Sequence, residues 1–201
     1  CPAIVVAGTV GSWVGASVMY WLSRLLGRPL LMRYGRYVLI TPDKIERRMQ
    51  RFRPQLVGIT SVTLNHHIAN AIGEVVHKCD GNVRIAMGGP HASFVIEGSF
   101  RDLPALDYIG IGEGEHTMIE LARSLEGRMD VRDVRGLALR HDGGIVRTPP
   151  RPLEDDLDRI PNPARDLVPL ARYLAFDSHA SVVTSRGCPY ECVFCSAPAW
   201  T

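Results

Sequence analysis

The sequence predicts an α/β protein built on a doubly wound, five-stranded parallel sheet. Between Pro2 and about Gly127, short apolar runs alternate with longer segments of helical periodicity. The apolar runs are continuous, which is typical of strands buried on both faces of a parallel sheet. Because the strand–helix order recurs five times, we expect helices on both sides of one sheet.

The elements follow one another in strict alternation. The predicted strands are Ala3–Ala7, Leu30–Arg33, Leu56–Thr60, Val83–Met87 and Tyr108–Ile111. The predicted helices are Trp13–Leu26, Pro42–Phe52, Asn65–Lys78, Ala92–Arg101 and Glu115–Leu125. Thr41 before Pro42 indicates an N-cap with proline at the first helical position, and Gly27 ends the first helix. Ligands of such sheets lie beyond the carboxyl ends of the strands, so we expect a binding site on the loops there.

After Gly127 the pattern changes. Two short apolar segments, Val134–Arg140 and Ile145–Thr148, flank an Asp-Gly pair that predicts a hairpin turn. Closely spaced prolines from Pro149 to Pro169 exclude a long helix or a central strand and predict a rigid linker.

A further strand, Ser181–Ser185, is predicted directly before a cluster of cysteines. We therefore expect three parts. Residues 1–127 form the α/β domain, residues 128–178 the hairpin and linker, and residues 179–201 the truncated beginning of a second domain.

Composition and charge argue against a nucleic-acid-binding, membrane or secreted protein. The 201 residues include 23 basic and 21 acidic side chains, so no strong net field attracts nucleic acid or an anionic membrane. The longest apolar stretch, Val10 to Leu26, is interrupted by serines and an arginine and is too polar to cross a bilayer. Three of the five cysteines crowd together, which argues against a secreted disulfide framework. We expect a cytoplasmic protein.

The crowded cysteines, Cys188, Cys192 and Cys195, have the spacing C-x3-C-x2-C. Three thiolates on one tight loop can hold three irons of a cubane cluster and leave the fourth iron open to a ligand. The alternative is a structural zinc site. Closed zinc sites need four ligands and commonly use C-x2-C pairs, and His179 is the nearby candidate for a fourth ligand.

This loop resembles that of the radical S-adenosylmethionine (SAM) enzymes. The resemblance rests on the preceding strand, on Arg186-Gly187, on the proline after the first cysteine and on Phe194 before the third. It implies that the three cysteines ligate a [4Fe-4S] cluster whose open iron binds SAM, and that Phe194 lies beside the adenine of SAM. An external electron donor would reduce the cluster, and cleavage of SAM would give a 5′-deoxyadenosyl radical.

The preceding domain resembles the cobalamin-binding domain found before the radical barrel in one large subclass. The segments that carry this resemblance are Pro54–Ser61, Met87–His91, Gly110–Glu115 and, in the linker, Leu157–Ala164. Gly110–Glu115 lacks the closing glycine of a dinucleotide fingerprint and carries two carboxylates, which disfavours a nicotinamide cofactor.

The resemblance implies a set of cobalamin contacts on the loops after the third and fourth strands: Ser61, Thr63, Gly88, Gly89 and Pro90. Glycines without a Cβ would let a flat corrin or its nucleotide tail approach the backbone, and the two hydroxyls would bond to the tail. The plainer interpretations are a strand-to-helix turn at Gly88–Pro90 and helix caps at Ser61 or Thr63.

One departure from the family pattern concerns cobalt. Many cobalamin proteins carry D-x-H-x-x-G after the first strand, and alignment on Gly15 places Val10 and Ser12 where the Asp and His would be. We therefore predict cobalamin without a protein histidine ligand, with Ser12 and Gly15 near the cofactor. Three histidines, His66, His67 and His91, lie close after the carboxyl ends of predicted strands, on the expected rim, but their spacing does not indicate a cobalt ligand.

By resemblance, the activity is methyl transfer to an unactivated carbon or phosphorus of a small-molecule substrate, by way of the deoxyadenosyl radical and methylcobalamin. The alternatives are an oxidative cyclase or rearrangement enzyme, as in anaerobic tetrapyrrole cyclases, and a cobalamin-binding module without activity. A methylthiotransferase is disfavoured because the leading domain of that family supplies three further cluster cysteines, which Cys1 and Cys79 cannot provide. No catalytic residue beyond the cluster ligands is assigned, and we expect this chain alone to be inactive.

Overall fold

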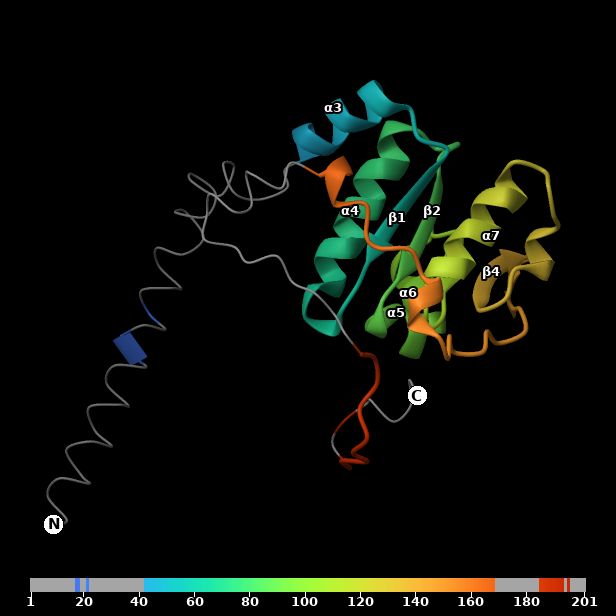
Figure 1. Ribbon diagram of the computed structural model, residues 1–201. Helices are drawn as coiled ribbons and strands as arrows, with labels where there is room; N and C mark the ends of the chain where they lie inside the picture. The colour runs from blue at the N-terminus through green and yellow to red at the C-terminus, as the bar shows by residue number, and fades with distance from the viewer. Residues whose placement is uncertain (1–16, 19–20, 22–41, 169–184, 194, 196–201) are drawn as a thin grey trace, which may run out of the picture. The chain divides into compact units, whose positions relative to one another are not determined.

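A computed structural model describes residues 17–18, 21, 42–168, 185–193 and 195 of the chain (Figure 1). The chain divides into two units, Cys1–Pro54 and Gln55–Thr201, which are described separately. None of the helices in the described ranges is long and apolar enough to span a membrane.

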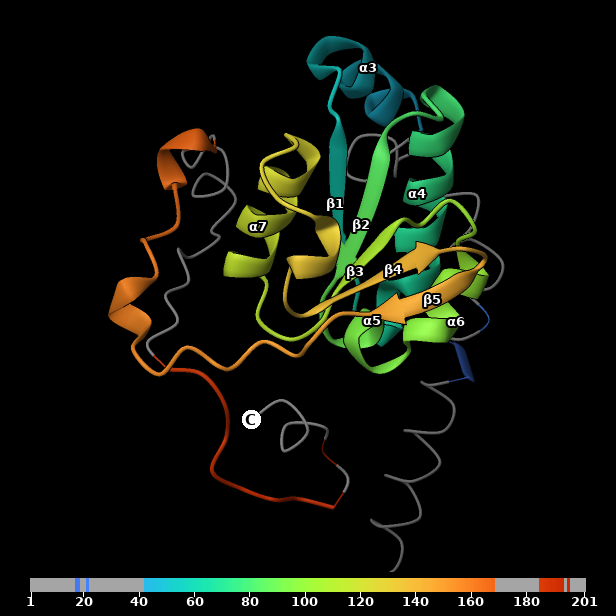
Figure 2. The same ribbon diagram turned by 90° about the vertical axis from the view of Figure 1, so that its right-hand side faces the viewer.

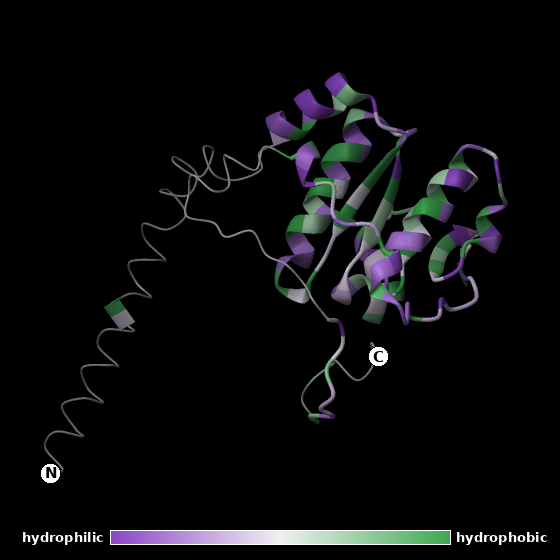
Figure 3. Cartoon of the chain, in the orientation of Figure 1, coloured by the Kyte–Doolittle hydropathy of each residue, from purple (hydrophilic) through white to green (hydrophobic). Residues whose placement is uncertain are grey.

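In the first unit, helix α3 covers Pro42–Phe52, with the bounds that the sequence predicts. It is largely hydrophilic (Figure 3), and Met49 is its buried residue. Of the predicted helix Trp13–Leu26, residues 17, 18 and 21 are described, and these are helical. The predicted strands Ala3–Ala7 and Leu30–Arg33 lie outside the described residues.

The second unit contains a five-stranded sheet with the order β1-β2-β3-β4-β5. The strands are β1 Leu56–Thr60, β2 Arg84–Gly88, β3 Tyr108–Gly110, β4 Leu137–His141 and β5 Gly144–Arg147. The first three are mutually parallel, and β4 and β5 continue the sheet in antiparallel pairing. The three parallel strands lie within one or two residues of their predicted bounds.

Helices cover both faces of this sheet, as Figure 2 shows. Helices α4 His66–Cys79, α5 Pro90–Phe94 and α6 Ile96–Asp102 lie on one side, and α7 Glu115–Leu125 lies on the other. Ile85, Ala86 and Met87 of β2 are all buried, as expected for a strand covered on both faces. The α/β fold class is thus confirmed.

The hairpin departs from the expectation of a wholly parallel sheet followed by a separate linker. Strand β4 pairs with β3, with Tyr108 opposite Leu139. The side chains of Leu137 and Leu139 belong to the buried cluster with Leu121 of α7. An isolated two-stranded hairpin is only marginally stable. The apolar β4 therefore gains its burial by extending the sheet, which makes the described sheet mixed.

Two local differences have clear causes. The predicted helix Ala92–Arg101 begins earlier, because Pro90 occupies its first turn, and it breaks at Val95 (φ −120°, ψ 56°) into α5 and α6. The hairpin turn uses positive φ at Asp142 (48°) and Gly143 (77°), as an Asp-Gly turn requires.

The linker between β5 and residue 168 holds only short 3-10 turns, Leu157–Arg159 and Arg165–Leu167, as its prolines predict. Of the predicted strand Ser181–Ser185, residues 181–184 lie outside the described ranges. The division into domains at residues 127 and 178 stays a prediction.

Candidate functional site

The loops at the carboxyl ends of the three parallel strands are joined by hydrogen bonds. The Ser61 amide donates to the carbonyl of Gly88 (2.9 Å), and the His91 amide donates to the carbonyl of Ser61 (3.1 Å). Ser93 connects the next loop, since its hydroxyl donates to Gly110 O (3.4 Å) and accepts from the Gly112 amide (3.3 Å). We call the segments at these strand ends, residues 61–67, 88–93 and 111–115, the carboxyl rim.

The two hydroxyl residues predicted to contact cobalamin lie on this rim in different environments. Ser61 is fully buried, with its Oγ 3.4 Å from His66 Nδ1, whereas Thr63 is exposed, with its Oγ1 3.2 Å from His91 Nδ1. Asn65 occupies the N-cap position of α4. Helix capping therefore does not explain Ser61 or Thr63, and Thr63 is the hydroxyl that faces outward.

The two glycines of the rim have different reasons for lacking a Cβ. At Gly89 (φ +92°) a Cβ would lie 2.7 Å from the Ser61 carbonyl oxygen and 2.9 Å from Thr60 Oγ1. Its neighbour Pro90 is exposed and begins α5, so Gly89-Pro90 is required by the strand-to-helix turn itself. At Gly88, by contrast, a Cβ would meet no atom of the described residues within 4 Å.

A second glycine extends this open strip of backbone. Gly58 of β1 is exposed, and an added Cβ there would also meet nothing within 4 Å among the described residues. Open backbone beside hydrogen-bonding groups fits a flat macrocycle with a polar tail. Gly58, Gly88 and Thr63 are the described residues best placed to receive cobalamin.

The rim also holds two stacked histidines. The rings of His66 and His91 have centroids 3.9 Å apart at 34°. His66 Nε2 lies 3.3 Å from Asp102 Oδ2. Burial and the neighbouring His66 lower the pKa of His91, against the opposing effect of Asp102. Both Nδ1 atoms lie beside rim hydroxyls, so the pair braces the rim, while His67 is exposed.

The cysteine loop carries the thiols of Cys188, Cys192 and Cys195, none of them in a disulfide among the described residues, and all three residues are exposed. The Cys195 amide donates to the carbonyl of Cys192 (3.0 Å), which turns the chain between the second and third cysteines. Within the described part of the chain, no three His, Cys, Asp or Glu side chains are gathered closely enough to hold a metal ion. The role of the three cysteines as cluster ligands stays a prediction that rests on their thiolate chemistry. Three other predicted cofactor contacts, Ser12, Gly15 and Phe194, lie outside the described residues.

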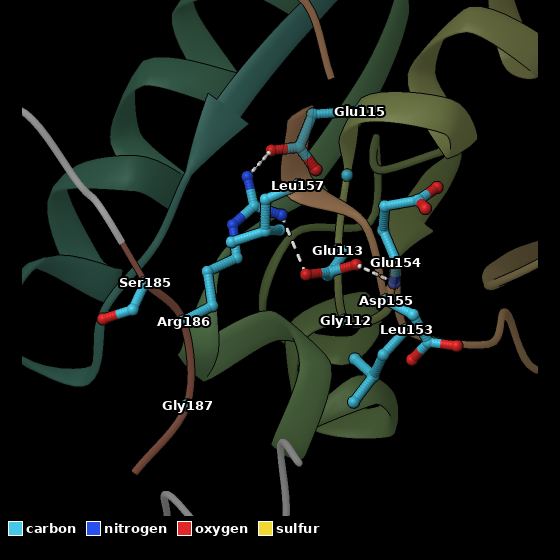
Figure 4. Close-up of a pocket in the computed structure, with 11 residues that line it drawn as sticks. Gly112, Glu113, Glu115, Leu153, Glu154, Asp155, Leu157, Ser185, Arg186 and Gly187 are labelled. Carbon is cyan, nitrogen blue, oxygen red and sulfur yellow. Dashed lines mark hydrogen bonds and ion pairs between the residues drawn. The ribbon is translucent and has the colours of Figure 1, made fainter. Parts of the chain in front are cut away.

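A cavity of about 650 Å³ lies where the loop after β3, the linker and the start of the cysteine loop meet (Figure 4). Arg186 forms ion pairs there with Glu113 (Nη1 to Oε1, 2.8 Å) and with Glu115 (Nη2 to Oε1, 2.5 Å). The hydrogen bonds that the guanidinium donates to these carboxylates raise the pKa of Arg186. Burial is the largest single effect on the pKa of Glu115 and would raise it, but the Arg186 hydrogen bond, a backbone hydrogen bond and the nearby positive charges together lower that pKa.

The linker is fastened beside this cavity. The Glu154 amide donates to Glu113 Oε2 (3.0 Å), and Glu154 Oε2 lies 3.5 Å from His116 Nε2. Arg151, whose side chain is only 13% exposed, donates to Thr117 Oγ1 (2.9 Å) and forms an ion pair with Glu120. The linker is therefore held against α7 by specific polar contacts.

The sequence did not predict the contacts of Arg186 with Glu113 and Glu115. From the sequence, Glu113 and Glu115 counted only as two carboxylates that disfavour a dinucleotide, and Arg186 only as part of the cysteine-loop resemblance. The available signals were a Gly-Glu-Gly-Glu segment at a strand end and an arginine beside the cysteines. Nothing in the sequence pairs two sites separated by 73 residues.

Comparison with known proteins identifies a domain family for the part of the chain that contains the rim. A family model described as a B12 binding domain matches residues 36–122. An uncharacterized methyltransferase of Pyrococcus horikoshii is 38% identical over 159 residues, which cover 79% of this chain and 35% of that protein. An anaerobic magnesium-protoporphyrin IX monomethyl ester cyclase of Rubrivivax gelatinosus is 29% identical over 164 residues, covering 78% and 29% respectively. The chain thus spans about a third of the length of these relatives.

A solved structure shares the fold. It is that of the cobalamin-dependent S-adenosylmethionine radical enzyme OxsB with aqua-cobalamin and S-adenosylmethionine bound. The TM-score is 0.67 at 25% identity, over 77% of this chain and 22% of that one. Together with the matched domain model and the relatives, this likeness shows that the chain belongs to the radical SAM proteins that contain a cobalamin-binding domain.

Proposed function

We propose that the protein is a cobalamin-dependent radical SAM enzyme that transfers a methyl group to an unactivated carbon or phosphorus of a small-molecule substrate. The observation that carries this proposal is the attachment of the cysteine loop to the carboxyl rim, through Arg186, Glu113 and Glu115. The methyltransferase relative from Pyrococcus horikoshii supports the class of reaction.

The chain's own residues would divide the work between two cofactors. When bound, cobalamin supplies the transferable methyl group, and the cluster with SAM supplies the radical chemistry that activates the substrate. Open backbone at Gly58 and Gly88 would accept the macrocycle, and Thr63 would donate to or accept from its tail. Cys188, Cys192 and Cys195 would ligate the cluster, and an external donor would supply its electron.

The histidine arrangement supports cobalamin without a protein imidazole ligand. Both ring nitrogens of His66 already lie beside groups of this chain, Nδ1 beside Ser61 and Nε2 beside Asp102. His91 Nδ1 lies beside Thr63. A cobalt ligand from His66 would have to give up one of these contacts, and His91 would have to ligate through Nε2 while its Nδ1 stays beside Thr63.

Cobalamin binding is tested by retention of hydroxocobalamin through gel filtration. Gly88→Val should abolish retention without unfolding the chain, because a side chain there meets only the space assigned to the cofactor. Gly81→Val is the matched control, since Gly81 is an exposed glycine in the turn before β2, away from the carboxyl ends of the strands. A folded wild-type chain that retains no cobalamin would refute the proposal.

The cluster is tested by anaerobic reconstitution with iron and sulfide. We expect a broad absorption near the blue edge of the visible spectrum, lost when all three cysteines are changed to alanine. Tight zinc binding without iron uptake would favour the structural site instead.

A cyclase is the second candidate, because the Rubrivivax gelatinosus relative carries that activity in its name. The two reactions differ in the fate of the SAM methyl group. In an assay of the protein at the full length of its relatives, a methyltransferase moves a labelled methyl group from SAM to the bound cobalamin under reducing conditions. Label that remains on SAM and methionine, with cobalamin and cluster both present, would favour the cyclase.

A further inference from the structure

We propose, resting on the proposed function, that Arg186 is a positioning residue. It holds the beginning of the cysteine loop on the carboxyl rim through Glu113 and Glu115. By doing so it sets the separation between the metal centre of the loop and the cofactor on the rim. We call these three residues the Arg186 bridge.

The first argument is the geometry of the guanidinium. Its two terminal nitrogens contact different carboxylates, Nη1 that of Glu113 (2.8 Å) and Nη2 that of Glu115 (2.5 Å), as Figure 4 shows. Two separate anchors fix the orientation of the planar group as well as its position. A lysine ammonium, as a single point charge on a flexible stem, would not fix that orientation.

The anchors are themselves held in place. Glu113 uses its second oxygen to accept the Glu154 amide (3.0 Å), so one carboxylate connects the loop after β3, the linker and the cysteine loop. Glu115 lies in the first turn of α7, where the helix dipole favours its negative charge. Gly112 (φ +74°) and Gly187 (φ +79°) turn the backbone on either side of the bridge.

A short series of contacts connects the bridge to both expected cofactors. On one side, Cys188 follows Arg186 by two residues, so their Cα atoms are at most roughly 7 Å apart. On the other side, the Gly112 amide donates to the Ser93 hydroxyl, and Ser93 lies in α5, which begins directly after Gly89. The bridge therefore joins the start of the cysteine loop to the rim.

Two other roles for Arg186 fit less well. An anionic substrate would have to displace two carboxylates, and the three side chains together carry a net charge of −1, which repels an anion. A role in global stability is also disfavoured, because Arg186 is 37% and Glu115 39% exposed, and exposed ion pairs contribute little to folding. The bridge joins segments more than 70 residues apart, which is the arrangement expected of a positioning contact.

The first test uses amide hydrogen exchange in the chain without cofactors. In the cysteine loop the Cys195 amide donates to the Cys192 carbonyl (3.0 Å), and Arg186→Gln should speed its exchange by about five- to tenfold, the effect expected from losing two partly exposed ion pairs. Arg186→Lys should give an intermediate rate. Arg147→Gln is the matched control, because it removes a comparable ion pair with Glu97 (2.5 Å) on the hairpin and should leave this exchange rate unchanged.

The second test uses the chain loaded with iron, sulfide and cobalamin. Pulsed dipolar electron paramagnetic resonance between the reduced cluster and cob(II)alamin should give a narrow distance distribution in the wild type. We expect a broader one in Arg186→Gln at equal iron and cobalamin content, with Arg147→Gln unchanged. Arg186→Lys should restore the narrow distance distribution only in part.

The outcomes separate the two proposals. Wild-type exchange rates in Arg186→Gln, or an equal distance distribution, would overturn the positioning role. If the wild type takes up neither cluster nor cobalamin, the proposed function fails. The exchange measurement then still decides whether the bridge holds the cysteine loop.

Discussion

Gly89 approaches Ser61 so closely that a Cβ on Gly89 would lie 2.7 Å from the Ser61 carbonyl oxygen. The same carbonyl accepts the His91 amide (3.1 Å), so neither strand end can shift without losing a hydrogen bond. The two adjacent glycines of the rim therefore serve different purposes. Gly89 is needed by the fold, whereas a Cβ at Gly88 would meet no described atom within 4 Å, as the proposed cobalamin site requires.

This difference predicts opposite results for two alanine substitutions. Gly89→Ala should lower the free energy of unfolding by about 1–3 kcal/mol, because it combines a clash with backbone and a positive φ. Gly88→Ala should change stability little but weaken cobalamin retention. Urea denaturation and cofactor gel filtration measure the two effects. Equal stabilities for the two variants would contradict this assignment.

Arg151 is the side chain that fastens the linker to α7. It donates to Thr117 Oγ1 (2.9 Å) and to the Arg135 carbonyl (3.2 Å), and it pairs with Glu120. Because its side chain is only 13% exposed, Arg151→Met should leave polar groups without partners and cost about 1–3 kcal/mol in urea denaturation.

The matched control for this prediction is Arg159→Gln. Arg159 is 74% exposed and pairs with Asp156 on the same turn of the linker (3.4 Å). Its loss should cost under about 0.5 kcal/mol. If the two variants unfold at the same urea concentration, the linker is not held by Arg151.

Local patterns predicted the parts of the fold that depend on neighbouring residues. Helices Pro42–Phe52 and Glu115–Leu125 and strand Leu56–Thr60 have their predicted bounds, because proline placement, amphipathic spacing and continuous apolar runs act over a few residues. The rim followed from these elements, since parallel strands bring their carboxyl ends to one edge.

Long-range pairing was beyond such patterns. The pairing of Tyr108 with Leu139 depends on burial of the hairpin's apolar side chains, which no local signal reports. The contact of Arg186 with Glu113 depends on how the linker returns to the rim. In both cases the residue types were visible in the sequence, but the partner was set by the tertiary path of the chain.

The stacked histidines predict a stability that depends on pH. The pKa of His91 is lowered by burial and by His66, although Asp102 opposes this, and Thr63 is the remaining polar neighbour. Between the lowered pKa and the unfolded value of about 6.5, the unfolded chain binds more protons than the folded one. The contribution of His91 to stability is therefore complete above about pH 6.5 and declines as the pH falls.

We expect His91→Gln to flatten this decline, because glutamine keeps a polar side chain beside Thr63 but cannot titrate. His67→Gln, on the same rim but exposed, is the control and should retain the wild-type slope. Urea denaturation at a series of pH values from about 5 to 8 covers the window in which an unshifted histidine titrates. If stability depended on pH in His91→Gln as steeply as in the wild type, protonation of His91 would not be coupled to folding. The rim would then be held by the backbone hydrogen bonds among Ser61, Gly88 and His91 and not by the imidazole of His91.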